Sequence, residues 1–401
     1  MKVIKSVCQM CGPGYAGCGI DVHVSDGKVI KIEGTKGHPV NDGKLCAKGL
    51  AAIQMEYDPG RLQYPLKRAG ARGEGKWQRV SWDEAMATIV TRLKAIIAAD
   101  GARAITWFKG QGSAWESNWS YAQRFMNALG SPNSVTQGHN CEIPRAIACR
   151  YTYGSIAWPD YENTRCVVLW GYNPLNTSLP NNGARVMRAK QRGAKLIVID
   201  PRFTRTAAKA DIFVQLRPGS DGALALGMLN VIIEENRYDK EFVDKWTGGF
   251  DKLSELVKQY PPEKVAEITW VPAEMIREIA RIYATTKPAV LQDGNGLDQQ
   301  PTVIQTLRAL CILRVITGNL DVPGGNVFNP EAPPFFSRTA PMTMRDMSKE
   351  GWQRSFQGSV STHPLFYGTS VVTLPEAIEA ILTEKPYPIR AVILHSINPV
   401  V

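Results

Sequence analysis

The chain has 401 residues, of which 44% are hydrophobic and 21% are charged, a composition typical of folded globular proteins. It has no apolar run of about 18 residues or more, which excludes a transmembrane helix, and its length suffices for two or three domains. The first residues, MKVIKSV, are too short and too polar for a secretory signal, so we expect a cytoplasmic protein that reaches a membrane only through a partner.

The formal net charge is +10, and the Lys and Arg residues are scattered along the chain. A solvated basic surface is the simplest explanation of this charge. Nucleic-acid binding is a poorer one, because the sequence has no basic stripe with interleaved aromatic residues. A third explanation is a buried polyanionic cofactor, whose phosphates need Arg, Lys and backbone N–H partners.

The first predicted elements are a β-hairpin and a long helix. Residues 20–34 alternate with a period of two around the turn Ser25-Asp26-Gly27, which predicts a hairpin. Residues 82–100 have apolar positions at helical spacing. Ser81 and Glu84 have the spacing of a capping box, and Gly101 is expected to end the helix.

From residue 104 onward, buried strands and helices alternate. The predicted strands each run into a turn rich in Gly, Asn, Asp or Pro, and they lie in CVVLWGYNP (166–174), AKLIVIDPRF (194–203) and AVLQDGNG (289–296). The predicted helices between them are LALGMLNVIIEENR (224–237) and PAEMIREIARIYATT (272–286). This rhythm predicts an α/β protein with doubly wound parallel sheets, in which ligand loops follow the carboxyl ends of the strands.

The segment IRAVILHSINPVV (389–401) predicts a buried strand that enters a loop. A strand-to-loop junction is a poor place to end a domain. We therefore expect the chain to be the N-terminal part of a longer protein or one piece of a split one.

Four cysteines are the strongest chemical signal. Cys8, Cys11 and Cys18 lie close together, and 27 residues separate Cys18 from Cys46. Three near thiolates and one distant one suit a cubane iron–sulfur cluster, which needs soft ligands on separate corners. A structural zinc site is an alternative, although it usually has a second close pair, and free thiols are another. Three other cysteines lie in predicted strands or helices and are expected to be buried thiols: Cys149, Cys166 and Cys311.

Several blocks in a fixed order carry a family resemblance. They are CQMCGPGYAGC, HPVNDGKLCAKG, YDPGRLQYPLKR, SWDEA and VIDPRFTRTAAKADIFVQLRPGSDGALALGMLN. With them the whole chain resembles the molybdopterin oxidoreductase family, the dimethyl-sulfoxide-reductase superfamily of bis-pterin molybdenum and tungsten enzymes, and within it the branch that includes acetylene hydratase. The family usually has three residues between its second and third cysteines, whereas this chain has six, GPGYAG. The Gly and Pro residues of this segment point to a looped-out insertion.

The resemblance implies two cofactors and a set of ligands. A 4Fe-4S cluster would be held by Cys8, Cys11, Cys18 and Cys46. Lys48 would bridge the cluster and a pterin, although from the residues alone it is an ordinary surface lysine.

The second implied cofactor is bis-molybdopterin guanine dinucleotide with molybdenum or tungsten, and Cys141 would be its protein ligand. From the residues alone, a single Cys before a helix is most often a small buried hydrophobe. A helix N-terminus at this point would also lower the pKa of the thiol. The flanking residues His139 and Glu142 are either polar helix-start residues or catalytic groups that tune the metal or transfer protons.

The pterin dinucleotides would be bound by Gly- and Asn-rich loops and by carboxylates that face the guanine. Any one of these loops alone is an ordinary turn, and their repetition at successive strand ends predicts a cleft. The predicted cofactor-binding residues are Lys48, Lys109, Gln111, Gly112, Gly171, Asn173, Asn176, Asp200, Arg202, Gly219, Asp221, Gly294 and Asn398.

The resemblance also implies the domain order. A small β-rich iron–sulfur domain would occupy residues 1–60. A first α/β domain would combine 61–136 with 328–401 and be incomplete, since the C-terminal part of the family fold is expected to be missing. A second α/β domain that binds a pterin dinucleotide would occupy 137–327. The irregular stretch from 329 to 353 is expected to line a substrate funnel.

Three functions remain open at this point. The first is an oxidoreductase with two-electron chemistry on a small molecule, whose cluster passes electrons to a ferredoxin-like partner subunit. The second is a non-redox hydratase or transhydroxylase, and the third is a cluster-carrying electron-transfer subunit. Acetylene hydratase has a carboxylate directly after the second cluster cysteine and an apolar residue after the metal-binding cysteine. The present chain has Gly12 and Glu142 there, which disfavours hydration. No nucleic-acid partner is expected.

Overall fold

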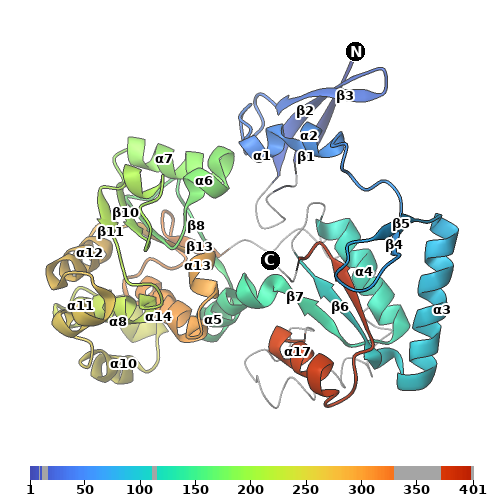
Figure 1. The fold of residues 1–401 in the computed structure, drawn as a ribbon. Helices are drawn as coiled ribbons and strands as arrows, with labels where there is room; N and C mark the ends of the chain where they lie inside the picture. Colours follow the sequence, from blue (N-terminus) through green and yellow to red (C-terminus); the bar gives the residue numbers. More distant parts are fainter. Residues whose placement is uncertain (9, 11–16, 111–114, 329–371, 399–401) are drawn as a thin grey trace. The chain divides into compact units, whose positions relative to one another are not determined.

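The computed structural model describes residues 1–8, 10, 17–110, 115–328 and 372–398, without the side chains of 115–120 and 139. The chain divides into two compact units (Figure 1). Unit 1 comprises residues 1–137 and 334–401, and unit 2 comprises residues 138–333. The finer division into three domains stays a prediction. Among the described helices, none has the length and apolar character needed to span a membrane.

Unit 1 begins with an antiparallel sheet of three strands, β1 (Lys2–Cys8), β2 (Cys18–Ser25) and β3 (Lys28–Gly34), in the order β1-β2-β3. The predicted hairpin is confirmed. Its turn residues Asp26 and Gly27 both have positive φ, 51° and 75°, as tight hairpin turns require. Two short helices, α1 (Ala47–Leu50) and α2 (Ala52–Glu56), contact β3.

The long predicted helix is α3 (Trp82–Asp100). The Ser81 hydroxyl accepts a hydrogen bond from the backbone N–H of Glu84 at 3.1 Å, and Gly101, with φ of 80°, ends the helix. The Glu84 carboxylate pairs instead with Lys67 Nζ at 3.2 Å. Of the two hydrogen bonds of the predicted capping box, the described contacts include the one that Ser81 accepts. They lack the one that the Glu84 side chain would accept, because its carboxylate contacts Lys67.

The α/β part of unit 1 has a parallel sheet with the order β14-β6-β7. Its central strand is β6 (Ile105–Lys109), α4 (Trp115–Leu129) connects β6 to β7 (Ser134–Thr136), and α17 (Leu374–Thr383) precedes β14 (Ala391–His395).

The prediction that residues 391–395 form a buried strand was wrong in one respect. The strand forms, but Val392 and Leu394 are 41% and 52% exposed. These two residues share one face of the strand, and the described elements of unit 1 leave that face exposed.

Unit 2 contains a four-stranded parallel sheet with the order β11-β10-β9-β12, which confirms the α/β class. Its strands are β9 (Cys166–Trp170), β10 (Lys195–Ile199), β11 (Ile212–Val214) and β12 (Ala289–Asp293). The register aligns Ile199, Trp170 and Asp293 on adjacent strands. The loops that follow these three residues therefore leave the sheet side by side.

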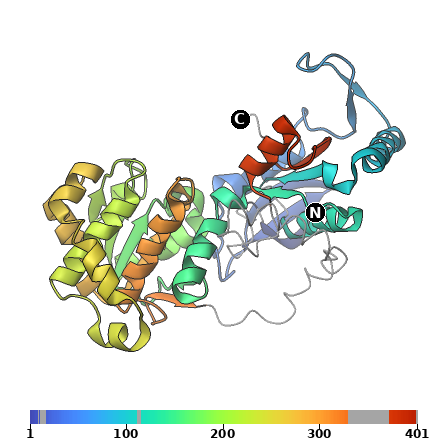
Figure 2. The same cartoon turned by 90° about the horizontal axis from the view of Figure 1, so that it is seen from below.

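Helices cover both faces of this sheet (Figures 1 and 2). Along β9, Cys166, Val168 and Trp170 join the larger core, whereas Val167 and Leu169 join the smaller one. The larger core includes residues of α5 (Ile143–Tyr153), α8 (Asp221–Glu234), α12 (Ala273–Thr285) and α14 (Val303–Ile316). The smaller core lies under α7 (Ala184–Gln191). Period-two alternation thus gives the central strand two apolar faces, as a doubly wound sheet needs.

The remaining described elements are short or peripheral. They are β4 (Leu66–Arg68), β5 (Trp77–Arg79), η1 (Ala102–Ala104), η2 (Gln137–Asn140), β8 (Ala157–Pro159), α6 (Pro174–Thr177), η3 (Leu179–Gly183), η4 (Ala207–Lys209), α9 (Lys240–Trp246), α10 (Phe250–Val257), α11 (Pro262–Thr269), α13 (Asn295–Asp298) and β13 (Asn326–Phe328). The predicted funnel segment lies outside the described residues.

Candidate functional site

The N-terminal sheet brings together two of the four cysteines that are predicted to hold a cluster. Cys8 and Cys18 are directly opposite each other in the β1–β2 register. Side chains in such positions have Cβ atoms about 5 Å apart. Cys46 is the N-cap residue of α1, and all three thiols are half-buried. Cys11 lies outside the described residues.

A buried asparagine ties the loop that precedes Cys46 to the strand that begins at Cys18. Asn41 accepts a hydrogen bond from the N–H of Gly19 at 2.8 Å and donates one to its carbonyl at 3.0 Å. It also donates to the carbonyl of Lys44 at 2.7 Å. These contacts hold the chain near Cys46 against the chain near Cys18.

The donor chemistry here fits an iron–sulfur cluster better than a harder metal. Sulfur is the donor atom of all four predicted ligands, and cubane clusters are held by thiolates. In the described part of the chain, no three His, Cys, Asp or Glu side chains are grouped closely enough to hold a metal ion. Since the described part lacks Cys11, the four-ligand set stays a prediction.

The other predicted residues of unit 1 lie on α1 and near the ends of two strands. Lys48 is an exposed residue of α1. Lys109, which is buried, pairs in register with His395, so the loops after β6 and β14 leave the sheet together. Asn398, which is exposed, lies in the second of these loops. Gln111, Gly112 and the side chain of His139 are outside the described part.

In unit 2, the predicted strand-end residues Gly171, Asp200 and Gly294 are neighbours along one edge of the sheet, because they follow aligned residues. The two glycines permit a close backbone approach. A Cβ atom on Gly294 would lie 2.1 Å from the carbonyl oxygen of Gly171, and Gly171 itself has φ of 60°. Packing of the loops after β9 and β12 therefore requires glycine at both positions.

Several of the predicted polar residues at this edge have structural partners. Asp221 accepts hydrogen bonds from Trp170 Nε1 and Gln300 Nε2, both at 2.8 Å. Asn173 Oδ1 accepts one from the Thr206 hydroxyl at 2.6 Å.

Three further predicted residues are exposed: Asn176, Arg202 and Gly219. Asp200 accepts a hydrogen bond from the backbone N–H of Arg202 at 2.8 Å, and burial raises the pKa of this carboxyl.

Cys141 precedes α5, whose N-cap is the exposed residue Glu142. The thiol is half-buried, and Asn295 Nδ2 lies 3.4 Å from Sγ as a hydrogen-bond donor. The helix start was expected to lower the pKa of this thiol, and that expectation was wrong. Burial raises the pKa, and the carboxylate of Asp298 adds to the effect more than the cation of Arg145 offsets it.

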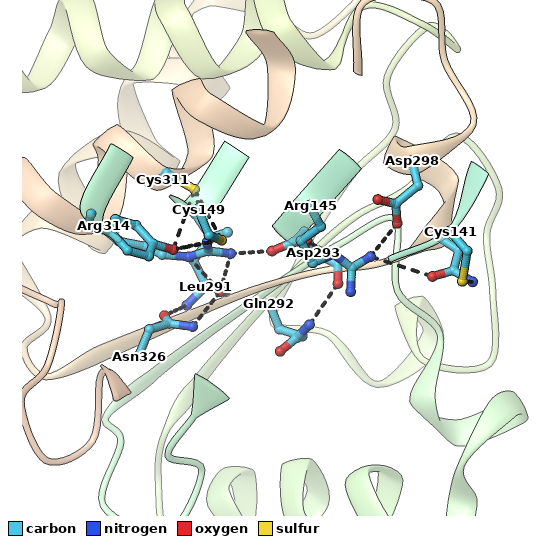
Figure 3. A network of polar contacts seen from close by, with 12 residues as sticks. Cys141, Arg145, Cys149, Leu291, Gln292, Asp293, Asp298, Cys311, Arg314 and Asn326 are labelled. Carbon is cyan, nitrogen blue, oxygen red and sulfur yellow. Dashed lines mark hydrogen bonds and ion pairs between the residues drawn. The ribbon is translucent and has the colours of Figure 1, made fainter. Parts of the chain in front are cut away.

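Beside Cys141 lies an ion network that sequence reasoning missed (Figure 3). Arg145 pairs with Asp293 through Nε and with Asp298 through Nη2, both at 2.5 Å. Asp293 also pairs with Arg314, and both of these side chains are 3% exposed. Burial alone would raise the pKa of Asp293, but the two guanidinium groups outweigh it and lower the pKa. A carboxylate at the end of the apolar run AVLQ is the sequence signal that could have identified this network.

The edge beside Cys141 also holds polar atoms that fit a bound polar cofactor. Burial raises the pKa of Asp298 to about 7 despite its pairing with Arg145. Asp298 Oδ1 and Gln300 Oε1 are buried without a hydrogen-bond partner among the described residues. Buried acceptors of this kind normally have a partner. Together with the thiol of Cys141, they give this edge the donor and acceptor groups that a metal-carrying polar group would use.

Comparison with known protein families matches nearly the whole chain. Residues 1–58 match the family described as "Molybdopterin oxidoreductase Fe4S4 domain". Residues 61–398 match the family described as "Molybdopterin oxidoreductase".

Individual proteins give the same picture. The chain is 35% identical to acetylene hydratase of Syntrophotalea acetylenica, with 96% of this chain and 55% of that protein covered. It is 32% identical to the thiosulfate reductase molybdopterin-containing subunit PhsA of Salmonella typhimurium, with 98% and 52% covered. The structure of acetylene hydratase from Pelobacter acetylenicus matches with a TM-score of 0.84 and 33% identity, over 98% of this chain and 57% of that one. The chain thus spans about half the length of these relatives.

Proposed function

Because this chain belongs to the molybdopterin oxidoreductase family and has its Fe4S4 domain, we propose that it is the catalytic-subunit portion of a molybdenum or tungsten oxidoreductase. The family's cofactors are a 4Fe-4S cluster and a molybdopterin with molybdenum or tungsten. When bound, the metal centre supplies two-electron chemistry, and the cluster carries single electrons. The observation that carries the proposal is the Cys141 thiol, which is half-buried beside Asn295 and near Asp298, whose buried Oδ1 has no hydrogen-bond partner in the described part of the chain.

In this proposal, residues of this chain have three tasks: binding the cluster, binding the metal and binding the dinucleotides. Cys8, Cys11, Cys18 and Cys46 would hold the cluster. Cys141 would hold the molybdenum or tungsten.

The third task is to hold the dinucleotides of a bis-pterin cofactor. The residues proposed for it are Lys109, Gln111, Gly112, Gly171, Asn173, Asn176, Asp200, Arg202, Gly219, Asp221, Gly294 and Asn398. Lys48, which follows Cys46 closely, would place a cation between the cluster and a pterin, where it neutralises their charge.

An electron-transfer partner forms part of the same proposal. One relative is named as the molybdopterin-containing subunit of a thiosulfate reductase, which implies companion subunits for that protein. We propose that a ferredoxin-like subunit accepts or supplies the electrons of the cluster here, and that the substrate is a small molecule.

Non-redox hydration is the second candidate, and the 35% identity to acetylene hydratase favours it. Glu142 argues against it, because an exposed carboxylate follows Cys141 where a hydratase has an apolar residue. Gly12, at the place of the hydratase carboxylate, lies outside the described residues.

A single set of assays separates these candidates. The protein, purified without oxygen, is analysed for iron, molybdenum and tungsten and then assayed with a viologen dye and a panel of oxyanions, N-oxides and formate. Acetylene hydration is measured in parallel without added electron donor. Dye-linked turnover that disappears in Cys141→Ala but persists in Cys166→Ala supports the redox proposal. Acetylene hydration without any dye-linked turnover overturns it, and a protein with iron but neither heavier metal is an electron-transfer subunit.

A further inference from the structure

Two cysteines outside the candidate metal site lie against each other in the interior of unit 2. Cys149 is on α5 and Cys311 is on α14, and each is 2% exposed. Their Sγ atoms are 3.7 Å apart (Figure 3). A disulfide has an S–S bond of about 2.05 Å, so side-chain rotation has to close the remaining gap of less than 2 Å.

The surroundings of this pair favour a thiolate. The Tyr153 hydroxyl lies 3.2 Å from Cys149 Sγ and 3.4 Å from Cys311 Sγ. Arg314 Nη1 donates to the Tyr153 hydroxyl at 3.1 Å and to Cys311 Sγ at 3.6 Å. A guanidinium this close stabilises a negative sulfur and repels a metal cation. The pair is therefore better suited to thiol chemistry than to metal binding.

One thiol of the pair differs from a cysteine that merely fills the core. The hydrogen bond from Cys311 and, after it, the charge of Arg314 lower the pKa of Cys149, whereas the same hydrogen bond and burial raise the pKa of Cys311. Cys166 is fully buried on β9, and burial raises the pKa of its thiol to about 12. Because the thiolate is the nucleophile, Cys149 is the attacking member of the pair once an oxidant reaches it.

We propose that Cys149 and Cys311 are a site of reversible oxidation by hydroperoxides, at which the two thiols form a disulfide between α5 and α14. The Cys149 thiolate attacks the O–O bond of ROOH, takes up the OH group as a sulfenic acid and releases RO⁻, which becomes ROH on protonation. Cys311 sulfur then attacks Cys149 sulfur, the S–S bond forms, and the S–O bond breaks. The leaving hydroxide takes the proton of Cys311 and departs as water. The dithiol thus loses two electrons, and the hydroperoxide gains them.

Oxidation of Cys149 and Cys311 would take place close to Cys141, the candidate metal ligand. The helix that carries Cys149 begins two residues after Cys141 and also carries Arg145. Arg314, which faces the thiols, shares Asp293 with Arg145 (Figure 3). A disulfide would fasten α5 to α14 and change the sulfur that accepts from Arg314 Nη1, so oxidation of the pair would alter the ion network beside Cys141.

The test is peptide mapping of the purified holoprotein before and after anaerobic treatment with about one equivalent of hydrogen peroxide. Free thiols are alkylated, and the protein is digested with trypsin. Cys149 lies in the tryptic peptide AIACR (146–150) and Cys311 in ALCILR (309–314). The expected product is these two peptides joined by a disulfide, which a dithiol reductant cleaves. Cys149 should lose its free thiol at least about ten times faster than Cys166.

Matched variants separate this site from the cluster cysteines, which peroxide also attacks. Cys149→Ser and Cys311→Ser should each abolish the joined peptide, whereas Cys166→Ser should leave it unchanged. Iron loss should be the same in all three variants. Three results overturn the proposal: both thiols stay alkylatable, Cys149 is oxidised only to sulfinic acid, or the disulfide joins either cysteine to a different one.

Discussion

The buried side chain of Asn41 holds the backbone of Gly19 at both of its polar groups, accepting from its N–H at 2.8 Å and donating to its carbonyl at 3.0 Å. A third hydrogen bond, to the carbonyl of Lys44, extends this clamp toward Cys46. The clamp explains how a loop without secondary structure can present a distant cysteine to a site that begins in a β-hairpin.

Replacing Asn41 should therefore release the predicted cluster without unfolding unit 2. Asn41→Ala removes all three hydrogen bonds of the clamp, each worth about 0.5–1.5 kcal/mol, while the Gly19 carbonyl keeps the backbone N–H of Thr35 as a donor. We expect iron and acid-labile sulfide to fall several-fold in the purified protein. Gln54→Ala, at an exposed position of α2, is the matched control and should retain both. Full iron content in Asn41→Ala would contradict the role of the clamp.

The close approach of the loops after β9 and β12 gives a second prediction. In Gly294→Ala the new Cβ atom would meet the carbonyl oxygen of Gly171 at 2.1 Å, so the backbone has to move. In Gly296→Ala the nearest atom is the same oxygen at 3.6 Å, an ordinary contact. Gly294→Ala should lower the free energy of unfolding by about 1–3 kcal/mol and reduce the molybdenum or tungsten content. Gly296→Ala should change neither, and equal effects of both substitutions in thermal unfolding and metal analysis would refute the steric argument.

The two carboxylates paired with Arg145 give a third prediction. Arg145→Met removes the cation that offsets the burial of both Asp293 and Asp298 and should lower the free energy of unfolding by about 3–5 kcal/mol. Asp298→Asn alone should be much milder, because burial already raises the pKa of this carboxyl to about 7. Adding Asp298→Asn to Arg145→Met should recover part of the loss. Thermal unfolding of the three variants measures this, and strict additivity would show that the two residues are not coupled.

A fourth prediction concerns pH. The pKa of Cys149 is lowered from its ordinary value of 9.0 to about 6, first by the hydrogen bond from Cys311. A lowered pKa in the folded state stabilises the protein fully above pH 9, and this contribution disappears as the pH falls through 6. The difference in unfolding temperature between the reduced parent protein and Cys149→Ser should therefore widen from pH 6 to pH 9. Cys166→Ser supplies the comparison, and a difference that stays constant over this range would show that Cys149 is not ionised in the fold.

Much of the fold could be predicted because its signals are local. The hairpin around Asp26 and Gly27, the helix that starts after Ser81 and the strand CVVLW each depend on neighbouring residues. The prediction for 391–395 was wrong about burial, since the strand's apolar composition does not reveal which of its faces other elements cover.

The candidate site was only partly predictable for the same reason. Cysteine spacing indicated Cys8, Cys11, Cys18 and Cys46 as ligands, and the family resemblance added Cys141. Nothing local indicated that Arg145 pairs with Asp298, which lies 153 residues further along the chain. The pKa of Cys141 was predicted in the wrong direction, because burial depends on segments distant in sequence.

The sequence by itself determined the family, the cofactor class and the βαβ order, since these depend on residue types at fixed spacing along the chain. Only the tertiary structure decided which groups became partners: Asn41 with Gly19, Arg145 with two buried carboxylates, and Cys149 with Cys311. The physical reason is that burial and electrostatic pairing depend on distance in space, which the packing of strands and helices sets and the spacing of residues along the chain does not.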